Sequence, residues 1–427
     1  MFDYWLDRPW LLPALLTLLL ACFAIGSSIN LGLYLDFANY YDAGSKIRYG
    51  EVANLYDPYA LVNGRPAQST MDFVAVPISA YLYVPLALLA PPTALLVFKW
   101  QNTAAYLTGL LILFLHCRQF AGLGPSDQRR FATLFTLLAL IFQPFWFTYR
   151  VGGQVTPTVF LCFIASLLCH LSRRYLASAL LMTFIILIKP GFAIGIALLA
   201  LLSGLRFLLY FSASGLAAAA LSISTVGWPA HAAFLTRAKN HSSAPELFWG
   251  NDAFTVILEN LRYCALKVQM TVAVIALDWT RIAISLFLAA SFFWLIRLSR
   301  QAIPTGSARL HFLFLASLCF GQLLLPVVWE HYLAVLFLPL AYFVACHRYF
   351  DREALALVAA IFLLPAVRNF TFVLWMHGAP VHQDAFPLWA LMLLALSKSA
   401  TLLLLAVFLQ RHFRSWFRTY AAPNWIN

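Results

Sequence analysis

The sequence predicts an all-α protein that crosses a membrane many times, and two properties of the chain support this fold class. Hydrophobic residues make up 63% of the 427 positions and charged residues only 10%, a mixture that a water-soluble core of this size does not need. The apolar residues also fall in successive stretches, separated by short polar breaks. A spanning helix needs roughly 20 apolar residues, so we expect about 12 spans, with a range of about 11 to 13.

The first apolar stretch begins at Trp10 and is longer than the core of a signal peptide. The residues before it carry two acids and lack a basic start, so we expect a retained helix. The expected spans are 10–33, 94–116, 131–149, 155–171, 175–188, 190–205, 207–227, 271–296, 310–328, 332–346, 354–373 and 387–409.

The placement of the arginines predicts the topology. With a cytoplasmic N-terminus, 15 of the 28 basic residues lie on short loops that face the cytoplasm, as the positive-inside rule requires. Both termini are then cytoplasmic, and the net charge of +12 reflects topology rather than a nucleic-acid partner. The segment Val74–Ala90 is apolar enough to span, but counting it would move Arg129 and Arg130 outside. We therefore expect a re-entrant or surface-lying helix there.

Two long outer loops, 34–74 and 228–270, offer the room for a site that faces water, and we expect short surface helices in them. The whole chain, 1–427, reads as a single transmembrane domain without an internal repeat, which disfavours a repeat-built transporter. Asp36 directly follows the first span, where desolvation raises the pKa of a carboxyl and favours proton acceptance. It is a candidate general base, although an Asp that caps a helix starting at Phe37 is the simpler interpretation of its position alone.

Several short motifs occur in a characteristic order along the chain. They are Asp36, Tyr40-Tyr41-Asp42-Ala43-Gly44, Gly50, Leu55-Tyr56-Asp57-Pro58, Tyr83-Val84-Pro85-Leu86, Gly153-Gln154, Lys189-Pro190 and Trp329-Glu330-His331-Tyr332. The ordered set resembles glycosyltransferase family 87 of the GT-C superfamily, which includes polyprenyl-phosphate-mannose-dependent mannosyltransferases. Thr156 departs from the family pattern, since an Asn is usual there.

The resemblance implies an inverting transfer of a sugar, with mannose expected, from a polyprenyl-phosphate-linked donor. The acceptor would be a glycolipid, polysaccharide or protein on the outer, periplasmic face of a bacterial plasma membrane. Asp36 would be the base, and a phosphate leaving group needs no second carboxyl to protonate it, unlike the glycosidase arrangement. No cofactor is implied, and the oligomeric state is left open.

The donor phosphate requires cations or polar groups near the outer face. Our candidates are Arg150, Lys189 and His331, because ionisable residues at membrane depth usually mark function. Arg150 and Lys189 could instead reach to the interface, and His331 could hydrogen-bond Glu330. Further candidates for substrate binding are Gln154 and Glu330 from the motifs, and Arg237, Lys239, Asn240 and His241 from the second loop, where a solvated strip near lipid headgroups is the alternative.

The sequence disfavours a metal site and a nucleotide-sugar donor. Asp36 is followed by Phe37 and Ala38, so no Asp-x-Asp pair forms, and neither His nor Cys clusters at ligand spacing. No Gly-rich phosphate loop is present. Asp278 and Arg281, one turn apart, are expected to form an ion pair with each other. The alternative functions are a transporter or flippase of lipid-linked sugar and a structural assembly partner without chemistry.

Overall fold

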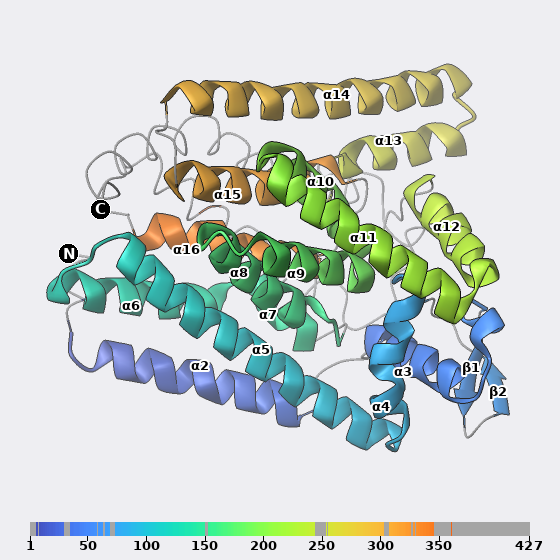
Figure 1. The fold of residues 1–427 in the computed structure, drawn as a ribbon, viewed down its shortest axis with the longest axis horizontal. Helices are drawn as coiled ribbons and strands as arrows, with labels where there is room; N and C mark the ends of the chain where they lie inside the picture. The colour runs from blue at the N-terminus through green and yellow to red at the C-terminus, as the bar shows by residue number, and fades with distance from the viewer. Residues whose placement is uncertain are drawn as a thin grey trace. The chain divides into compact units, whose positions relative to one another are not determined.

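The computed structural model describes residues 8–29, 35–57, 59–62, 65–68, 73–149, 153–243, 255–302, 307–325 and 330–345, together with residues 6, 253, 328 and 360. The chain divides into two compact units, and Figure 1 labels their helices and strands. Unit 1 comprises Met1–Leu140, Pro144–Ala193 and Gly204–Ser243, and unit 2 comprises Ile141–Gln143, Ile194–Ser203 and Ala244–Asn427.

Unit 1 is mainly helical and contains both the first predicted outer loop and the start of the second. Its elements, to within an end residue, are α2 (Leu11–Ser28), α3 (Leu35–Arg48), η1 (Val52–Asn54), β1 (Tyr59–Val62), β2 (Arg65–Gln68), η2 (Pro77–Tyr83), α4 (Val84–Ala87), α5 (Pro91–Phe120), α6 (Pro125–Ile141), α7 (Gln143–Phe147), α8 (Thr156–Leu171), α9 (Tyr175–Ile188), η4 (Pro190–Phe192), α11 (Leu205–Val226) and α12 (Trp228–Ser243).

Unit 2 is helical throughout its described residues. Its elements are α10 (Ala193–Leu202), α13 (Val256–Lys267), α14 (Thr271–Ala302), α15 (Ser307–Leu324), η5 (Glu330–Leu336) and α16 (Phe337–Ala345). The last two predicted spans, 354–373 and 387–409, lie outside the described residues except for Ala360.

The predicted all-α class holds for the described residues with one exception, a two-stranded antiparallel hairpin in the first outer loop. Strands β1 and β2 pair Tyr59 with Gln68 and Val62 with Arg65. The remainder of that loop, where described, forms the expected short helices, α3 and η1.

Only part of the predicted set of twelve spans is long and apolar enough to cross a membrane by itself. Within the described residues three helical stretches meet that test, Leu11–Ser28, Leu205–Val226 and Thr271–Arg297. The predicted span 94–116 lies within the 30-residue helix α5, which passes the test only together with η2 and α4. The other predicted spans that fall on described residues form shorter apolar helices or, like the stretch 131–149, divide into two. The full number of twelve therefore remains a prediction.

The segment before α5 is bent sharply rather than continuous with it. Helices η2 and α4 meet α5 at 114°, so together they form a broken span or a re-entrant loop. The bend agrees with a re-entrant segment at Val74–Ala90, but a broken span fits it equally, so the expected re-entrant or surface-lying helix stays a prediction. Pro91, at the first position of α5, suits a helix start because its missing N–H would have no helical partner there.

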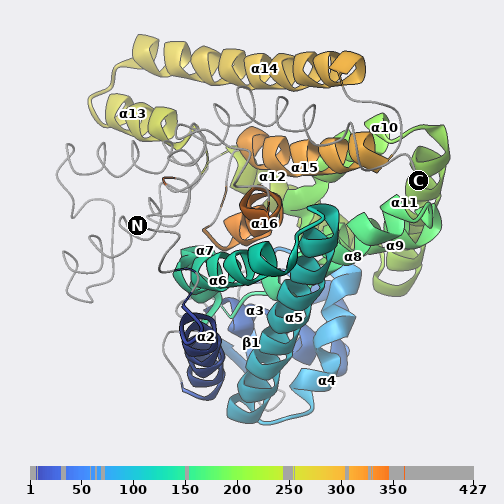
Figure 2. The ribbon, with the colours of Figure 1, turned by 90° about the vertical axis from the view of Figure 1, so that its left-hand side faces the viewer.

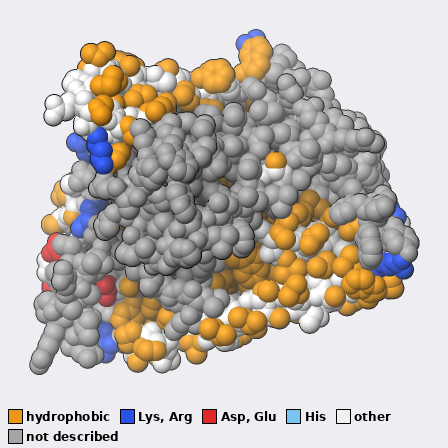
Figure 3. All heavy atoms as spheres, turned by 180° about the vertical axis from the view of Figure 1, so that it is seen from behind, with side chains coloured by type: hydrophobic (Ala, Val, Ile, Leu, Met, Phe, Trp, Pro, Cys, Tyr) orange, Lys and Arg blue, Asp and Glu red, His pale blue; other side chains and the backbone are white. Residues whose placement is uncertain are grey.

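The surfaces of the long apolar helices are those expected for contact with lipid. On α11, Leu216 is 72% exposed, and on α14, Val272 is 83% exposed. Hydrophobic side chains make up much of the described surface in Figure 3, with charged side chains at its edges. Leu and Val side chains in such numbers on the surface are stable in hydrocarbon and unfavourable in water.

The core of unit 1 is aromatic and holds α5, α7 and α8 together. The Tyr106 ring lies 4.6 Å from that of Phe145 and 5.9 Å from that of Phe160, centroid to centroid. Helices α8 and α9 form an antiparallel hairpin, joined by a short turn at 172–174, and α9 also packs on α11. These contacts support the start of α8 and the end of α9.

Unit 2 brings α10 and α15 into very close contact through two glycines. A Cβ atom placed on Gly321 would lie 2.6 Å from Gly195 Cα, and one placed on Gly195 would lie 2.9 Å from the Ser317 carbonyl oxygen. Small residues at such crossings let membrane helices pack backbone against backbone. Figure 2 gives a second view of these helices.

Candidate active site

Three chain segments in unit 1 bring together the predicted residues Asp36, Gln154 and Lys189. Asp36 lies in the first turn of α3. Gln154 lies just before α8, and Lys189 lies between the end of α9 and the 3-10 turn η4. Pro190 helps to end α9, because the residue before a proline is disfavoured in helical conformation, and Lys189 accordingly has φ −146° and ψ 78°.

Gln154 links the members of this cluster. Its side chain hydrogen-bonds the Asp36 carboxyl, and its Oε1 accepts a hydrogen bond from the Tyr40 hydroxyl at 3.1 Å. Asn102 of α5 donates to the Gln154 carbonyl oxygen at 2.9 Å. Gln154 is only 1% exposed, so these bonds hold its amide in one orientation, with the NH2 group directed to Asp36 and the oxygen to Tyr40.

Asp36 and Lys189 influence each other through their charges. Burial raises the pKa of the Asp36 carboxyl above its ordinary value, while the Lys189 charge and the Gln154 hydrogen bond oppose that rise. Burial lowers the pKa of Lys189 to about 8, and the Asp36 charge opposes that fall. A raised pKa makes the ionised Asp36 carboxylate a stronger proton acceptor, and the Lys189 ammonium is protonated at neutral pH.

Asp36 does not cap the helix, which answers the simpler interpretation of its position. The helix α3 begins at Leu35, so Asp36 lies within the first turn rather than before it, and its carboxyl bonds a side chain from another segment. A negative charge in the first turn is still favoured by the helix dipole. Part of Asp36 remains exposed.

An aromatic pair lies next to the cluster. The rings of Tyr40 and Tyr83 stack with a centroid distance of 4.8 Å and an interplanar angle of 19°. Phe98 lies against Tyr40 at 6.1 Å. The Tyr83 hydroxyl is buried and has no hydrogen-bond partner among the residues that the structure describes.

The second outer loop supplies Arg237, which the structure ties to the first outer loop. Arg237 Nη2 donates a hydrogen bond to the Tyr56 carbonyl oxygen, and the Phe234 ring packs against Tyr56 at 6.1 Å. Arg237 therefore holds α12 against the loop. Lys239 is exposed.

The other predicted site residues lie either outside the described part of the chain or in unit 2. Arg150 and the side chains of Asn240, His241 and Glu330 lie outside the described part of the chain. His331 belongs to η5 of unit 2, where it is 2% exposed and packs edge-on against Tyr332 at 4.8 Å.

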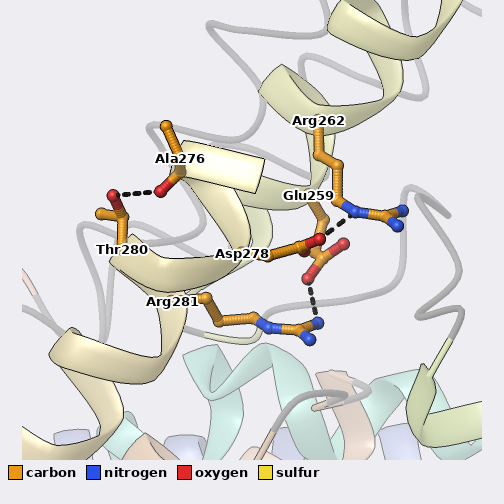
Figure 4. A network of polar contacts seen from close by, with 6 residues as sticks. All are labelled: Glu259, Arg262, Ala276, Asp278, Thr280 and Arg281. Atoms are coloured by element: carbon orange, nitrogen blue, oxygen red, sulfur yellow. Dashed lines mark hydrogen bonds and ion pairs between the residues drawn. The ribbon is translucent and has the colours of Figure 1, made fainter. Parts of the chain in front are cut away.

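The predicted ion pair between Asp278 and Arg281 is wrong, because both residues pair with α13 instead (Figure 4). Arg262 Nε donates to Asp278 Oδ1 at 3.0 Å, and Arg281 Nη1 donates to Glu259 Oε1 at 2.6 Å. The helices α13 and α14 pack as a hairpin, so the partner on the neighbouring helix competes successfully with the one a turn away. These pairs join two helices.

Several polar residues around the cluster were not among the predicted site residues. Tyr40 follows Asp36 by one helical turn, a spacing that puts both on one face of α3. Asn102 and Lys99 were detectable as polar residues within a predicted span. Lys99 Nζ donates to the Ile29 carbonyl oxygen at 2.8 Å, so it joins α5 to the end of α2.

The fold and the cluster define a class of protein with long apolar helices and, among shorter ones, an acidic side chain under the influence of a buried lysine. Comparison with protein families narrows that class, because the model of glycosyltransferase family 87 matches residues 73–326. This match covers more than half of the chain, so the protein belongs to glycosyltransferase family 87. A search of curated proteins found no match. The matched region includes Gln154 and Lys189, whereas Asp36 and His331 lie on either side of it.

Proposed function

We propose that this glycosyltransferase is an inverting enzyme that transfers a sugar from a polyprenyl-phosphate-linked donor to an acceptor hydroxyl. The observation that carries the proposal is the coupling of Asp36 to Lys189 and Gln154, in a member of a glycosyltransferase family. Such a transfer releases a proton from the acceptor hydroxyl and a negative charge on the leaving phosphate. A base and a buried cation in one site can accept the first and stabilise the second.

The reaction follows from the positions of these groups. Asp36 accepts the proton of the acceptor hydroxyl as its oxygen forms a bond to the anomeric carbon. The bond from that carbon to the phosphate oxygen breaks, and its electron pair leaves with the lipid phosphate. Attack from the face opposite the phosphate inverts the anomeric centre. Lys189 stabilises the negative charge on the leaving group, and Gln154 orients the Asp36 carboxylate.

The donor class follows from the lipid environment and the family resemblance. Polar groups lie where α8 begins and α9 ends, next to apolar helices, so a lipid-linked sugar can enter from the bilayer. Mannose is the sugar that the sequence motifs favour, and the acceptor is a glycolipid or glycan. The arginine-rich loops predict which face of the membrane is cytoplasmic, and the proposed site belongs to the other face. The proposed location is therefore the outer face of a bacterial plasma membrane.

The test is a transfer assay with purified full-length protein in proteoliposomes. Polyprenyl-phosphate-mannose and a nucleotide-mannose of equal concentration are compared as donors, and the product is examined for its anomeric configuration. The proposal predicts transfer from the lipid donor alone, with inversion. Transfer from the nucleotide donor, or movement of lipid donor across vesicles without acceptor and without transfer, would contradict it, and the second result would favour a flippase.

A further inference from the structure

The first turn of α8 holds a buried hydroxyl that the proposed chemistry does not yet use. Thr156 is the first residue of this helix and is 0% exposed. Its Oγ1 has no hydrogen-bond partner among the residues that the structure describes. A hydroxyl buried without a partner is unfavourable for folding, so a ligand that accepted its hydrogen bond would relieve this cost.

The helix end around Thr156 offers further hydrogen-bond donors. The first N–H groups of a helix have no partner within it, and Val155, which precedes the helix, provides no side-chain cap. Pro157 removes one of these N–H groups, which leaves those of Thr156 and Thr158 in the first turn. The helix is 16 residues long, so its dipole places partial positive charge at this end.

This helix end lies beside the proposed catalytic residues. Gln154, two residues before Thr156, hydrogen-bonds the Asp36 carboxyl. Helices α8 and α9 are antiparallel, adjacent and of similar length, so Lys189 at the end of α9 lies on the side where α8 begins. Thr158 is partly exposed, so the turn is not sealed.

We propose that the amino-terminal turn of α8, with the Thr156 hydroxyl, binds the phosphate of the lipid-linked donor together with Lys189. A phosphate oxygen accepts hydrogen bonds from the hydroxyl and from the free N–H groups, and the ammonium balances its charge. This inference rests on the proposed function, because it assumes an anionic donor. It assigns the leaving group to the α8 side of the cluster.

Binding of a simple probe tests the proposal without catalysis. Farnesyl phosphate and farnesol differ only in the phosphate, and their dissociation constants are measured by calorimetry on the full-length protein in detergent. Thr156→Val keeps the shape of the side chain and removes the hydroxyl. Thr156→Ser restores the hydroxyl. The matched control is Thr136→Val, since Thr136 is also buried, but its hydroxyl donates to the Ala132 carbonyl of its own helix.

The proposal predicts that Thr156→Val lowers the affinity for the phosphate without lowering the stability of the protein. Thr156→Val weakens binding of farnesyl phosphate by about tenfold or more, the effect of losing a hydrogen bond to a charged group, and leaves farnesol binding unchanged. The ligand-free variant melts no lower than the wild type, because a buried unpartnered hydroxyl has been removed. Thr156→Ser and Thr136→Val bind farnesyl phosphate like the wild type.

Equal affinity of Thr156→Val and the wild type for farnesyl phosphate would overturn the inference, as would a lowered melting temperature with no selective loss for the phosphate. The proposed function fails separately. If Asp36→Asn retained transfer while Thr156→Val lost phosphate affinity, the base assignment would fail and the phosphate site would stand.

Discussion

At the scale of single residues, two aspartates of the first outer loop, Asp36 and Asp42, differ in the groups that surround their buried carboxyls. Burial raises the pKa of both Asp36 and Asp42, but Asp36 is paired with Gln154 and faces Lys189, whereas the Asp42 charge is opposed by Lys46 alone. The first arrangement suits a base, and the second only destabilises the ionised form. This difference predicts separate consequences for the two carboxylates.

Asp42→Asn should stabilise the protein at high pH. The pKa of Asp42 rises from 3.8 to about 6 in the folded protein, so the folded state holds its proton more tightly than the unfolded state. The resulting stability is present below pH 4 and is lost as the pH rises through about 6. At pH 8 the free energy of unfolding of Asp42→Asn should exceed that of the wild type by at most about 3 kcal/mol, and solvent screening of the carboxylate reduces this difference.

The measurement is the melting temperature of Asp42→Asn and the wild type at pH 5 and pH 8. The variant should melt higher at pH 8, and the difference should shrink at pH 5. A constant difference at both pH values would show that the ionisation of Asp42 has no part in it.

Substitution of Lys189 should change the pH profile of transfer as well as its rate. Lys189→Met removes the charge that lowers the pKa of Asp36, so the acidic limb of kcat/KM should move to higher pH, with a loss of rate of about 100-fold or more. In the wild type an alkaline limb is expected near pH 8, where Lys189 loses its proton.

Lys189→Arg is the companion variant, because arginine stays charged at high pH. It should retain more activity than Lys189→Met and lose the alkaline limb. Identical pH profiles for the two variants and the wild type would contradict a role for the Lys189 charge.

At the scale of elements, the sequence predicted helices far better than their ends and connections. The stretch 131–149 was expected to be one span, but α6 ends at Ile141 and α7 begins at Gln143, because Pro144 interrupts the backbone hydrogen bonds of a continuous helix. The β1–β2 hairpin was missed, although Asn63-Gly64 is a strong hairpin signal in the sequence.

The crossing of α10 and α15 gives a prediction about packing. Gly321→Ala places a methyl group 2.6 Å from Gly195 Cα. Because this neighbour is a backbone atom, the two helices must move apart to accommodate the methyl group. The melting temperature should therefore fall by several degrees, which corresponds to about 1–3 kcal/mol. The matched control is Gly215→Ala in α11, where a Cβ meets nothing within 4 Å. That variant should be neutral or slightly stabilising, since alanine favours the helix.

An unchanged melting temperature for Gly321→Ala would show that the two helices separate easily. A fall for Gly215→Ala of the same size would remove the contrast on which the prediction depends.

The candidate site illustrates what a sequence can reveal. Asp36, Gln154 and Lys189 were found from an ordered set of motifs, and the structure joins them. Their link through Tyr40 and Asn102 depends on how α3, α5 and α8 pack, and no local pattern encodes that. The partners of Asp278 and Arg281 were wrong for the same reason, because a hairpin brought other charges within reach.

At the scale of the whole molecule, the chain is a membrane glycosyltransferase whose long apolar helices expose the surface that lipid requires. The sidedness of its loops is a prediction from the arginines. It can be tested at two exposed positions, Lys239 in α12 and Arg174 before α9.

For this test, single cysteines are placed at Lys239 or Arg174 in a variant without the native cysteines. A maleimide that cannot cross membranes should label Lys239→Cys in intact spheroplasts and Arg174→Cys only after the membrane is opened. The reverse pattern would place the Asp36 site on the cytoplasmic side.

The central claim is that Asp36 is the base of sugar transfer. The most direct measurement compares wild type, Asp36→Asn and Asp42→Asn in the reconstituted transfer assay with polyprenyl-phosphate-mannose, after each protein is shown to be folded by a cooperative melting transition. We predict that Asp36→Asn loses activity by about 1,000-fold or more, as expected for loss of a general base, while Asp42→Asn retains it. Transfer by Asp36→Asn at a rate near that of the wild type would contradict the claim.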